Sequence, residues 1–209
     1  METHSKLLQT KRLTMRQWRD ADREPFAAMN ADPAVMRYFP AALDRNESDA
    51  LVDRLASSID RNGWGFWAVE LSDSAKFIGF VGLNVPSVQF PFSPCTEVGW
   101  RLARAAWGHG YATEAGVAAL SFGFKELQLE KIVSFTAVTN APSIAVMRRL
   151  KMREMGYFDH PSLKPEIDLR RHVLFEIKST APTPRPSQVE SQWNSEGRSS
   201  TPTGFSSSQ

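Results

Sequence analysis

The segment of residues 97–138 constrains the fold more than any other, because it places two strand patterns around one long helix pattern. Residues 97–102 alternate as a strand does, and Gly108 and Gly110 then mark a tight turn. After the turn, polar residues recur in one stripe of an otherwise apolar helix, which predicts that most of its surface is buried. Residues 131–138 are almost entirely apolar, as a central strand is. This succession predicts a strand–helix–strand crossover within one sheet.

The glycine turn between the strand and the helix also has a chemical interpretation. A turn at a helix N-terminus presents backbone N–H groups that have no intrahelical partner, and the helix dipole adds partial positive charge. Such turns bind phosphate groups. A lone G-x-G pattern is explained equally well by the steric demands of a tight turn, so the rest of the chain must decide.

The remaining segments predict a mixed α/β sheet, mostly antiparallel, with flanking helices. Alternating patterns predict strands, and apolar residues four apart predict helices. In the first half we expect strands at residues 7–16, 65–71 and 76–83, helices at 18–29 and 46–59, and a helical turn at 33–39. In the second half we expect a helix at 140–150 and strands at 152–158 and 166–178.

Composition limits the compartment and the partners of the chain. The net charge of +2 over 209 residues gives no support for nucleic-acid binding. The sequence has no apolar run near the roughly 20 residues that span a bilayer, and its N-terminus lacks the layout of a signal peptide, so we expect no membrane. Cys95 is the single cysteine and cannot form an internal disulfide, which favours a cytoplasmic location.

We expect one domain, residues 1–178, followed by a tail of residues 179–209. The tail holds nine Ser and four Pro in 31 residues and few large apolar groups, so it is predicted to be disordered. The four His and one Cys of the chain show no metal-ligand spacing, and no metal is expected. The sequence contains neither the G-x-S-x-G elbow nor the P-loop motif.

Five motifs, taken in their order over about residues 6–178, resemble the GNAT superfamily of acyl-CoA-dependent N-acyltransferases. The resemblance is strongest to its branch of ribosomal-protein N-terminal (serine/alanine) acetyltransferases. The acyl-CoA loop of the family, Gln/Arg-x-x-Gly-x-Gly/Ala, corresponds to residues 107–112, where Trp107 departs from the general pattern but suits the branch. The motif Asn-x-x-Ser-x-x-Val-Met, closed by Leu-Gly-Met, corresponds to residues 140–152, with Lys151 in place of the glycine. The other three motifs are Thr10-Lys11-Arg12-Leu13, Gly65-Phe66-Trp67 and residues 171–175.

The resemblance implies a GNAT-like fold with a β-α-β acyl-CoA-binding core, and acetyl-CoA as the cosubstrate. In this family the N–H groups of the turn hold the pyrophosphate, and the pantetheine arm enters between two splayed strands. A backbone N–H near residues 100–102 would then polarise the thioester carbonyl as its oxyanion forms. The residues implied in acetyl-CoA binding are Trp100, Arg101, Leu102, Trp107, Gly108, His109, Gly110, Tyr111, Ala112, Thr113, Asn140 and Ser143.

Two residues are candidates for catalysis. Strand alternation places Glu97 on the same face as Gly99 and Arg101, which we expect to face the cleft, so Glu97 is the candidate base, directly or through water. The alternatives are a solvated strand glutamate or an ion-pair partner of Arg101. In many family members a Tyr protonates the leaving thiolate; Met147 holds that position here, and Ser143 is the substitute donor. A purely capping or CoA-binding role is an equal alternative for Ser143.

The acceptor is expected to be a primary amine, either a protein N-terminus or a small molecule such as an antibiotic, a polyamine or an amino acid. An α-amino group with a pKa of about 8 is partly neutral at pH 7, whereas a lysine with a pKa of about 10 is not. A non-catalytic CoA-binding sensor or interaction protein is the third alternative. We expect variable acceptor loops at residues 31–46 and 86–94, and aromatic pocket residues near Trp64 and Trp67. A homodimer that covers the apolar residues of the 86–94 loop is also considered.

Overall fold

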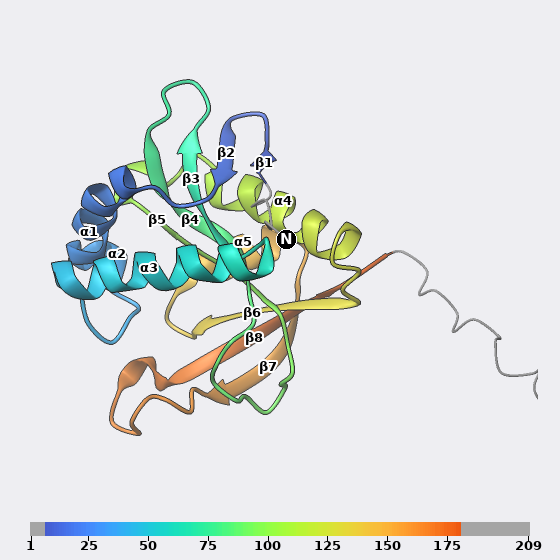
Figure 1. The fold of residues 1–209 in the computed structure, drawn as a ribbon. Helices are drawn as coiled ribbons and strands as arrows, with labels where there is room; N and C mark the ends of the chain where they lie inside the picture. The colour runs from blue at the N-terminus through green and yellow to red at the C-terminus, as the bar shows by residue number, and fades with distance from the viewer. Residues whose placement is uncertain (1–6, 181–209) are drawn as a thin grey trace, which may run out of the picture. The chain divides into compact units, whose positions relative to one another are not determined.

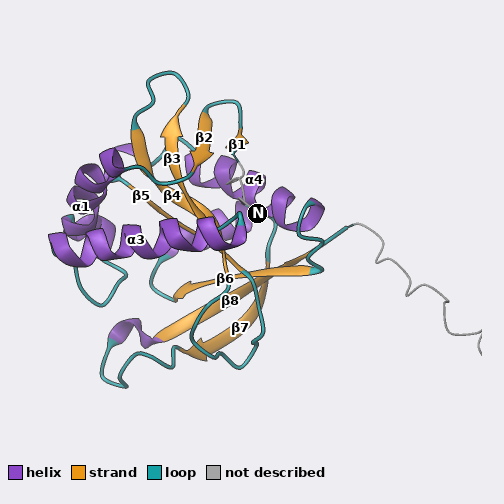
Figure 2. Cartoon of the chain, in the orientation of Figure 1, coloured by secondary structure: helices purple, strands orange, loops and turns teal. Residues whose placement is uncertain are grey.

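The computed structural model describes residues 7–180, which form one eight-stranded mixed sheet with helices packed against it (Figures 1 and 2). The strand order is β1-β2-β3-β4-β5-β6-β8-β7. Neighbouring strands are antiparallel except β5 and β6, which are parallel. The strands are β1 (Leu8–Gln9), β2 (Leu13–Arg16), β3 (Phe66–Leu71), β4 (Phe77–Asn84), β5 (Glu97–Leu102), β6 (Lys131–Ala137), β7 (Arg153–Asp159) and β8 (Arg171–Lys178).

Helices cover both faces of this sheet. They are α1 (Arg23–Ala31), α2 (Pro33–Met36), α3 (Arg45–Asn62), α4 (Tyr111–Lys125) and α5 (Ala141–Arg149). Alternation along β4 separates the two faces: the Phe80 ring packs against Phe26 of α1, whereas the Leu83 side chain lies against Gly123 of α4. A Cβ atom at Gly123 would lie only 2.6 Å from the end of the Ile132 side chain, so α4 packs closely on the sheet at this glycine. The predicted crossover of β5, α4 and β6 is confirmed, as is the mixed sheet.

The predicted first strand, residues 7–16, is wrong as a single element, because it divides into β1 and β2. The Thr10 hydroxyl donates a hydrogen bond to the Glu114 carboxylate at 2.6 Å, and the Arg12 guanidinium forms an ion pair with the same carboxylate at 2.6 Å. These contacts turn the chain toward the first turn of α4. Glu114 therefore anchors the N-terminal hairpin instead of lying on a purely solvated stripe.

The predicted helix of residues 18–29 begins later than expected, at the start of α1. Residues 20–22 form a 3-10 turn instead. The buried Asp22 carboxylate causes this, since it accepts hydrogen bonds from the Arg19 N–H at 2.8 Å and from the Arg16 guanidinium at 2.8 and 2.9 Å. An ion pair that spans two elements thus overrides the local helix pattern.

Two further boundaries differ from expectation for identifiable reasons. Helix α3 is longer than residues 46–59, because a capping box of Asp44 and Glu47 starts it early and Gly63, at φ 75°, ends it late. Strand β8 starts at Arg171 instead of residue 166. The residues before it form a loop with a short 3-10 turn at residues 168–170.

Residues 1–6 and 181–209 lie outside the described part of the chain. The predicted disordered tail falls almost wholly on them, so the disorder and the domain boundary at residue 178 stay predictions. Within residues 7–180, each helix is too short or too polar to cross a bilayer.

Candidate active site

The parallel strands β5 and β6 part to open a large cavity. Their register pairs Glu97 with Val133, where the Val133 N–H also donates to the Thr96 carbonyl at 3.0 Å. Beyond this point β5 pairs only with β4, and β6 pairs only with β8. A cavity of about 1310 Å³ occupies the opening and is lined by residues 97–102 and 134–136. Its volume exceeds that of a typical site for one drug-sized ligand, so it has room for two substrates.

The glycine turn forms one end of this cavity. Gly108 and Gly110 have φ values of 80° and 81°, a left-handed conformation that glycine adopts without strain. Gly110 is the N-cap of α4 and supplies no side chain to cap the helix. The first intrahelical bond runs from the Glu114 N–H to the Gly110 carbonyl, so the N–H groups of Tyr111–Thr113 have no intrahelical acceptor. All three residues line the cavity, which gives it an anion-binding end.

Trp107 fixes the turn to the end of β5. Its indole Nε1–H donates to the Leu102 carbonyl at 2.8 Å, although 46% of the residue remains exposed. This bond gives a physical reason for a Trp where the general family pattern has Gln or Arg. His109 is exposed, and its ring stacks on Tyr111 at 5.4 Å between centroids. Unlike its neighbours, His109 does not line the cavity, so its predicted role is limited to its backbone.

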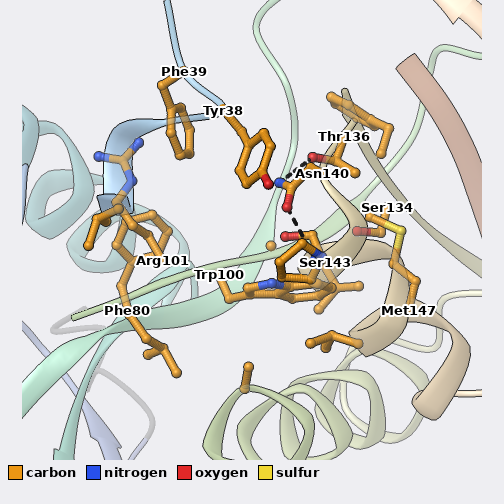
Figure 3. A pocket seen from close by; sticks show the side chains of 18 of the residues that line it. Tyr38, Phe39, Phe80, Trp100, Arg101, Ser134, Thr136, Asn140, Ser143 and Met147 are labelled. Atoms are coloured by element: carbon orange, nitrogen blue, oxygen red, sulfur yellow. Dashed lines mark hydrogen bonds between the residues drawn. The ribbon is translucent and has the colours of Figure 1, made fainter. Parts of the chain in front are cut away.

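Helix α5 supplies the opposite wall (Figure 3). The buried Asn140 caps this helix: its Oδ1 accepts from the Ser143 N–H at 3.3 Å, and its Nδ2 donates to the Thr136 hydroxyl at 2.8 Å. Both ends of the amide are thus engaged in holding α5 to β6. Ser143 and Met147 lie one turn apart on this helix and both line the cavity. The predicted CoA contact of Asn140 and the roles of Ser143 stay predictions.

Arg149 connects α5 with the anion-binding end. Its Nε–H donates to the Thr113 hydroxyl at 3.1 Å, beside the uncapped N–H groups of α4. The neighbouring Arg148 turns away and forms an ion pair with Glu154 at 3.6 Å. Arg149 is therefore the arginine of this pair that lies beside the anion-binding end of the cavity.

Glu97 lies at the closed end of the opening, on the cavity wall. Its Oε1 accepts a hydrogen bond from the Asn84 amide at 2.8 Å. Burial raises the pKa of this carboxyl, and the Asn84 hydrogen bond partly opposes the shift. No ion pair joins Glu97 to Arg101 within the described residues, so that alternative is wrong. A half-buried carboxyl with a raised pKa in a cleft is a candidate general base.

The residues of β5 face the cavity from both sides. Glu97, Gly99 and Arg101 share one face, as alternation predicts, and the Arg101 guanidinium lies over the Phe39 ring at 4.1 Å. Trp100 points to the other face but also lines the cavity, because the splayed edge exposes both faces of the strand. In Figure 3, Arg101 and Phe39 lie at one end of the view and Ser143 and Met147 at the other.

Some of the residues that line the cavity lie in segments that the sequence analysis named, and others do not. The predicted acceptor loop of residues 31–46 contributes Tyr38 and Phe39, which follow α2. Trp64 and Trp67 do not line the cavity, and Trp67 is fully buried against Phe122. The aromatic residue of this segment that lines the cavity is Phe66. No periodicity in the sequence distinguishes these positions. The other lining residues that the sequence did not indicate include Ser134, His160, Ser162, Leu163, Leu169 and His172.

The loop of residues 86–94 does not line the cavity, contrary to expectation. Phe90 and Phe92 stack at 5.2 Å and pack against Phe135 and Phe158 of the same chain. The loop thus covers its own apolar residues, which removes the reason for expecting a second subunit there. Within residues 7–180, no group of three His, Cys, Asp or Glu side chains is arranged to hold a metal ion.

The sheet has one splayed parallel pair of strands, and a glycine turn begins the helix at one end of the opening. This is the arrangement expected of an acyl-CoA-dependent transferase. The model of the acetyltransferase (GNAT) domain family matches residues 12–153. The Bacillus subtilis protein YkkB is 31% identical over 153 residues, 73% of this chain and 87% of its own. The B. subtilis N-acetyltransferase YnaD is 31% identical over 150 residues, 71% of this chain and 84% of its own. The chain belongs to the GNAT acetyltransferase family, and it is an acetyl-CoA-dependent N-acyltransferase.

Solved structures confirm the fold. A GNAT-family acetyltransferase from Bacillus anthracis superimposes with a TM-score of 0.70 at 24% identity, over 83% of this chain and 98% of that one. Mycobacterium smegmatis RimJ, solved with CoA-disulfide, gives a TM-score of 0.67 at 19% identity, over 85% and 90%. The ribosomal-protein-S5-alanine acetyltransferase of Vibrio fischeri gives 0.66 at 18% identity, over 83% and 96%. The solved structures of similar fold thus include a ribosomal-protein acetyltransferase, a member of the branch that the motifs of this chain resemble.

Proposed function

We propose that the chain transfers an acetyl group from acetyl-CoA to a primary amine by direct attack within a ternary complex. The observation that carries the proposal is the position of Glu97: a half-buried carboxyl with a raised pKa shares one cavity with the anion-binding turn. A base and a donor site in one cavity allow the amine to be deprotonated beside the thioester. No covalent acyl-enzyme is needed, and half-buried Cys95, whose thiol pKa is raised by burial, is a poor nucleophile.

In this mechanism acetyl-CoA lies along the opening between β5 and β6. The N–H groups of residues 108–113 bind its pyrophosphate, and Arg149 contributes positive charge beside them. A backbone N–H of residues 100–102 donates to the carbonyl oxygen as negative charge develops on it. The amine loses a proton to Glu97 and its nitrogen attacks the carbonyl carbon. The carbon–sulfur bond then breaks, the Ser143 hydroxyl gives its proton to the leaving sulfur, and Ser143 takes up the second proton that the new amide nitrogen releases.

The acceptor is a protein N-terminus or a small amine. The ribosomal-protein acetyltransferases among the structural neighbours favour the first, and the deep, aromatic-walled pocket around Tyr38 and Phe39 accommodates either. A CoA-binding sensor without turnover is the other candidate, because buried Met147 replaces the usual Tyr donor. We place the reaction in the cytoplasm because the one cysteine is free. Size-exclusion chromatography with light scattering tests whether the chain forms a homodimer.

Two measurements on the full chain test the proposed function. Isothermal titration with acetyl-CoA is expected to give saturable binding, and an absence of heat together with an unchanged melting temperature would refute the donor site. A screen of N-terminal peptides, ribosomal proteins and small amines, followed by thiol release, is expected to yield an acetylated amine. Tight acetyl-CoA binding without transfer to any amine would instead favour the sensor.

A further inference from the structure

Arg101 is held at the acceptor end of the cavity by contacts with neutral groups. Its guanidinium lies between the rings of Phe39, at 4.1 Å, and Phe80, at 5.6 Å. Its Nη1–H donates at 2.7 Å to the side-chain oxygen of Asn30, which is fully buried. The Asn30 amide in turn donates to the buried Ser48 hydroxyl at 2.9 Å. This chain of contacts fixes the position of the guanidinium without neutralising its charge.

No carboxylate of the described residues pairs with Arg101. Its Nε is buried without an acceptor, and no described residue accepts from its Nη2. Burial lowers the pKa of Arg101 to about 10, so the side chain still carries its charge at pH 7. A largely buried cation without a counter-ion is unfavourable unless an anion joins it. By contrast, buried Arg16 has two carboxylate partners, Asp22 and Glu70.

The charges of the residues that line the cavity also favour an anionic group on the acceptor. Glu97 is the one carboxylate among the described lining residues, whereas Arg37 and Arg101 line the acceptor end of the cavity and Arg149 lines its anion-binding end. A site for a polyamine or another polycation would carry several carboxylates. The acceptor end is therefore electrostatically suited to an amine that also bears negative charge.

Glu97 and Arg101 lie on one face of β5, separated by Gly99. Their Cα atoms are about 13 Å apart at the rise of a strand. The Phe66 ring packs over Gly99, 3.0 Å from the place where a Cβ would lie, and lines the space between the two side chains. An acceptor lying along this strand can place its amine near Glu97 and its anionic group toward Arg101.

We propose that Arg101 binds a carboxylate of the acceptor, so that the acceptor is an amine with a carboxylate on the same molecule. The planar guanidinium matches a carboxylate through paired N–H donors. The distance between Glu97 and Arg101 favours an acceptor whose amine and carboxylate are well separated, such as an ω-amino acid or a peptide with an acidic side chain near its N-terminus. The proposal rests on the proposed function for the position of the amine, but the carboxylate site can be measured by binding alone.

The test uses matched pairs of probes on the full chain with acetyl-CoA. One arm compares α-amino acids and longer ω-amino acids with their carboxamides, and a second compares peptides with Asp or Glu as second residue with their Asn or Gln counterparts. We expect kcat/KM to favour the acid of a pair by on the order of 10- to 100-fold. The amine of an α-carboxamide has a lower pKa than the amine of the acid, so a larger fraction of it is neutral and reactive at pH 7. Amine reactivity therefore favours the carboxamide and cannot produce a preference for the acid. The arm with the larger ratio of kcat/KM for acid over amide shows whether the carboxylate belongs to an amino acid or to a peptide side chain.

Three variants assign the preference to this side chain. Arg101→Met keeps the stem and is expected to abolish the acid preference while acetyl-CoA titrates as in the wild type. Arg101→Lys keeps the charge and is expected to retain part of the preference. Arg104→Met removes an arginine from the exposed 3-10 turn nearby and is expected to change nothing. Retention of acetyl-CoA binding shows that the Met variant is folded.

Titration of the same acids and carboxamides into the CoA complex separates this inference from the proposed function. If the acids bind through Arg101 but none is acetylated, the proposed transfer fails and the carboxylate site stands. If amides are acetylated as fast as acids, or Arg101→Met keeps the acid preference, the transfer stands and the carboxylate site is refuted. Failure of every acid to bind the complex also refutes the site.

Discussion

Glu97 and Val133 form the one register pair between β5 and β6 in the described chain, so the candidate base lies where the two strands begin to part. On its other side, Glu97 pairs with Asn84 of β4. Desolvation raises the pKa of this carboxyl, and the hydrogen bond from Asn84 partly opposes the shift. The candidate base therefore lies at the point where the opening for acetyl-CoA begins.

Replacing Glu97 with Gln is expected to lower the rate of amine acetylation by about 10²- to 10⁴-fold, the usual contribution of a general base. A base acts when it is deprotonated, and a raised pKa means that activity is lost as the pH falls through a value above that of an ordinary glutamate. The wild-type profile of kcat/KM against pH should show this acid limb, and Glu97→Gln should lack it. An unchanged profile in the variant would remove Glu97 from the role.

Asn84→Ala serves as the control for this assignment. The Asn84 amide donates to the Glu97 carboxylate and so lowers its pKa. Its removal should raise the pKa further and move the acid limb to higher pH, with little change in the plateau rate. A shift to lower pH would contradict the assignment of the limb to Glu97.

The two glycines Gly108 and Gly63 give a matched test of the phosphate turn. Both have left-handed φ values, 80° and 75°, and a Cβ at either would meet no atom within 4 Å. Each change to Ala should therefore cost a similar free energy of unfolding, about 1–2 kcal/mol, from backbone strain alone. Only Gly108→Ala should also weaken acetyl-CoA binding in calorimetry. Equal effects on binding would reduce the turn to a steric role.

The sequence predicted the parts of the site that depend on local pattern, namely the glycine turn, the N-cap Asn140 and the face of Glu97. It predicted that residues 31–46 contribute to the acceptor wall, but not which side chains would do so. The Phe39 ring lies over Arg101 only because the helices α1–α3 pack on the sheet. The loop of residues 86–94 was misplaced because its phenylalanines find partners on β6 and β7, a non-local contact that no local pattern encodes.

Element boundaries failed for a related reason. Asp22 lies within the predicted helix of residues 18–29 and Glu114 within the helix after the glycine turn, yet each accepts hydrogen bonds from a distant part of the chain or an adjoining strand. The strength of an ion pair depends on how deeply it is buried, and burial is a property of the assembled fold. The first strand and the first helix were therefore the elements predicted least well.

Arg16 and Arg45 offer a comparison of buried and exposed ion pairs. Arg16 contacts Asp22 and Glu70, all three being at least nine-tenths buried, whereas Arg45 pairs on the surface with Glu24 and Asp49. Arg16→Met should cost about 3–5 kcal/mol in the free energy of unfolding, because it leaves the buried Asp22 carboxylate without a cation and Glu70 with only the more distant Arg19 at 3.5 Å. Arg45→Met should cost under about 1 kcal/mol. Urea unfolding of both variants gives the comparison, and similar costs would refute it.

Ser143 is the remaining candidate for protonating the thiolate, and its contacts allow the alternatives to be separated. Asn140 caps α5 through the backbone N–H of Ser143, which alanine retains. Ser143→Ala should therefore keep the melting temperature, and a capping role predicts no kinetic effect at all. A role in CoA binding predicts a weaker acetyl-CoA affinity with kcat preserved.

Proton donation predicts a third pattern for Ser143→Ala. The kcat should fall by about 10²-fold with acetyl-CoA affinity unchanged, because the hydroxyl is needed only as charge develops on sulfur. The defect should shrink above a pH of about 8.5, the usual pKa of a thiol, since the leaving thiolate then needs no proton. Ser143→Thr, which keeps a hydroxyl, should recover much of the rate at neutral pH. A defect that is independent of pH and not relieved by Thr would exclude Ser143 as the donor.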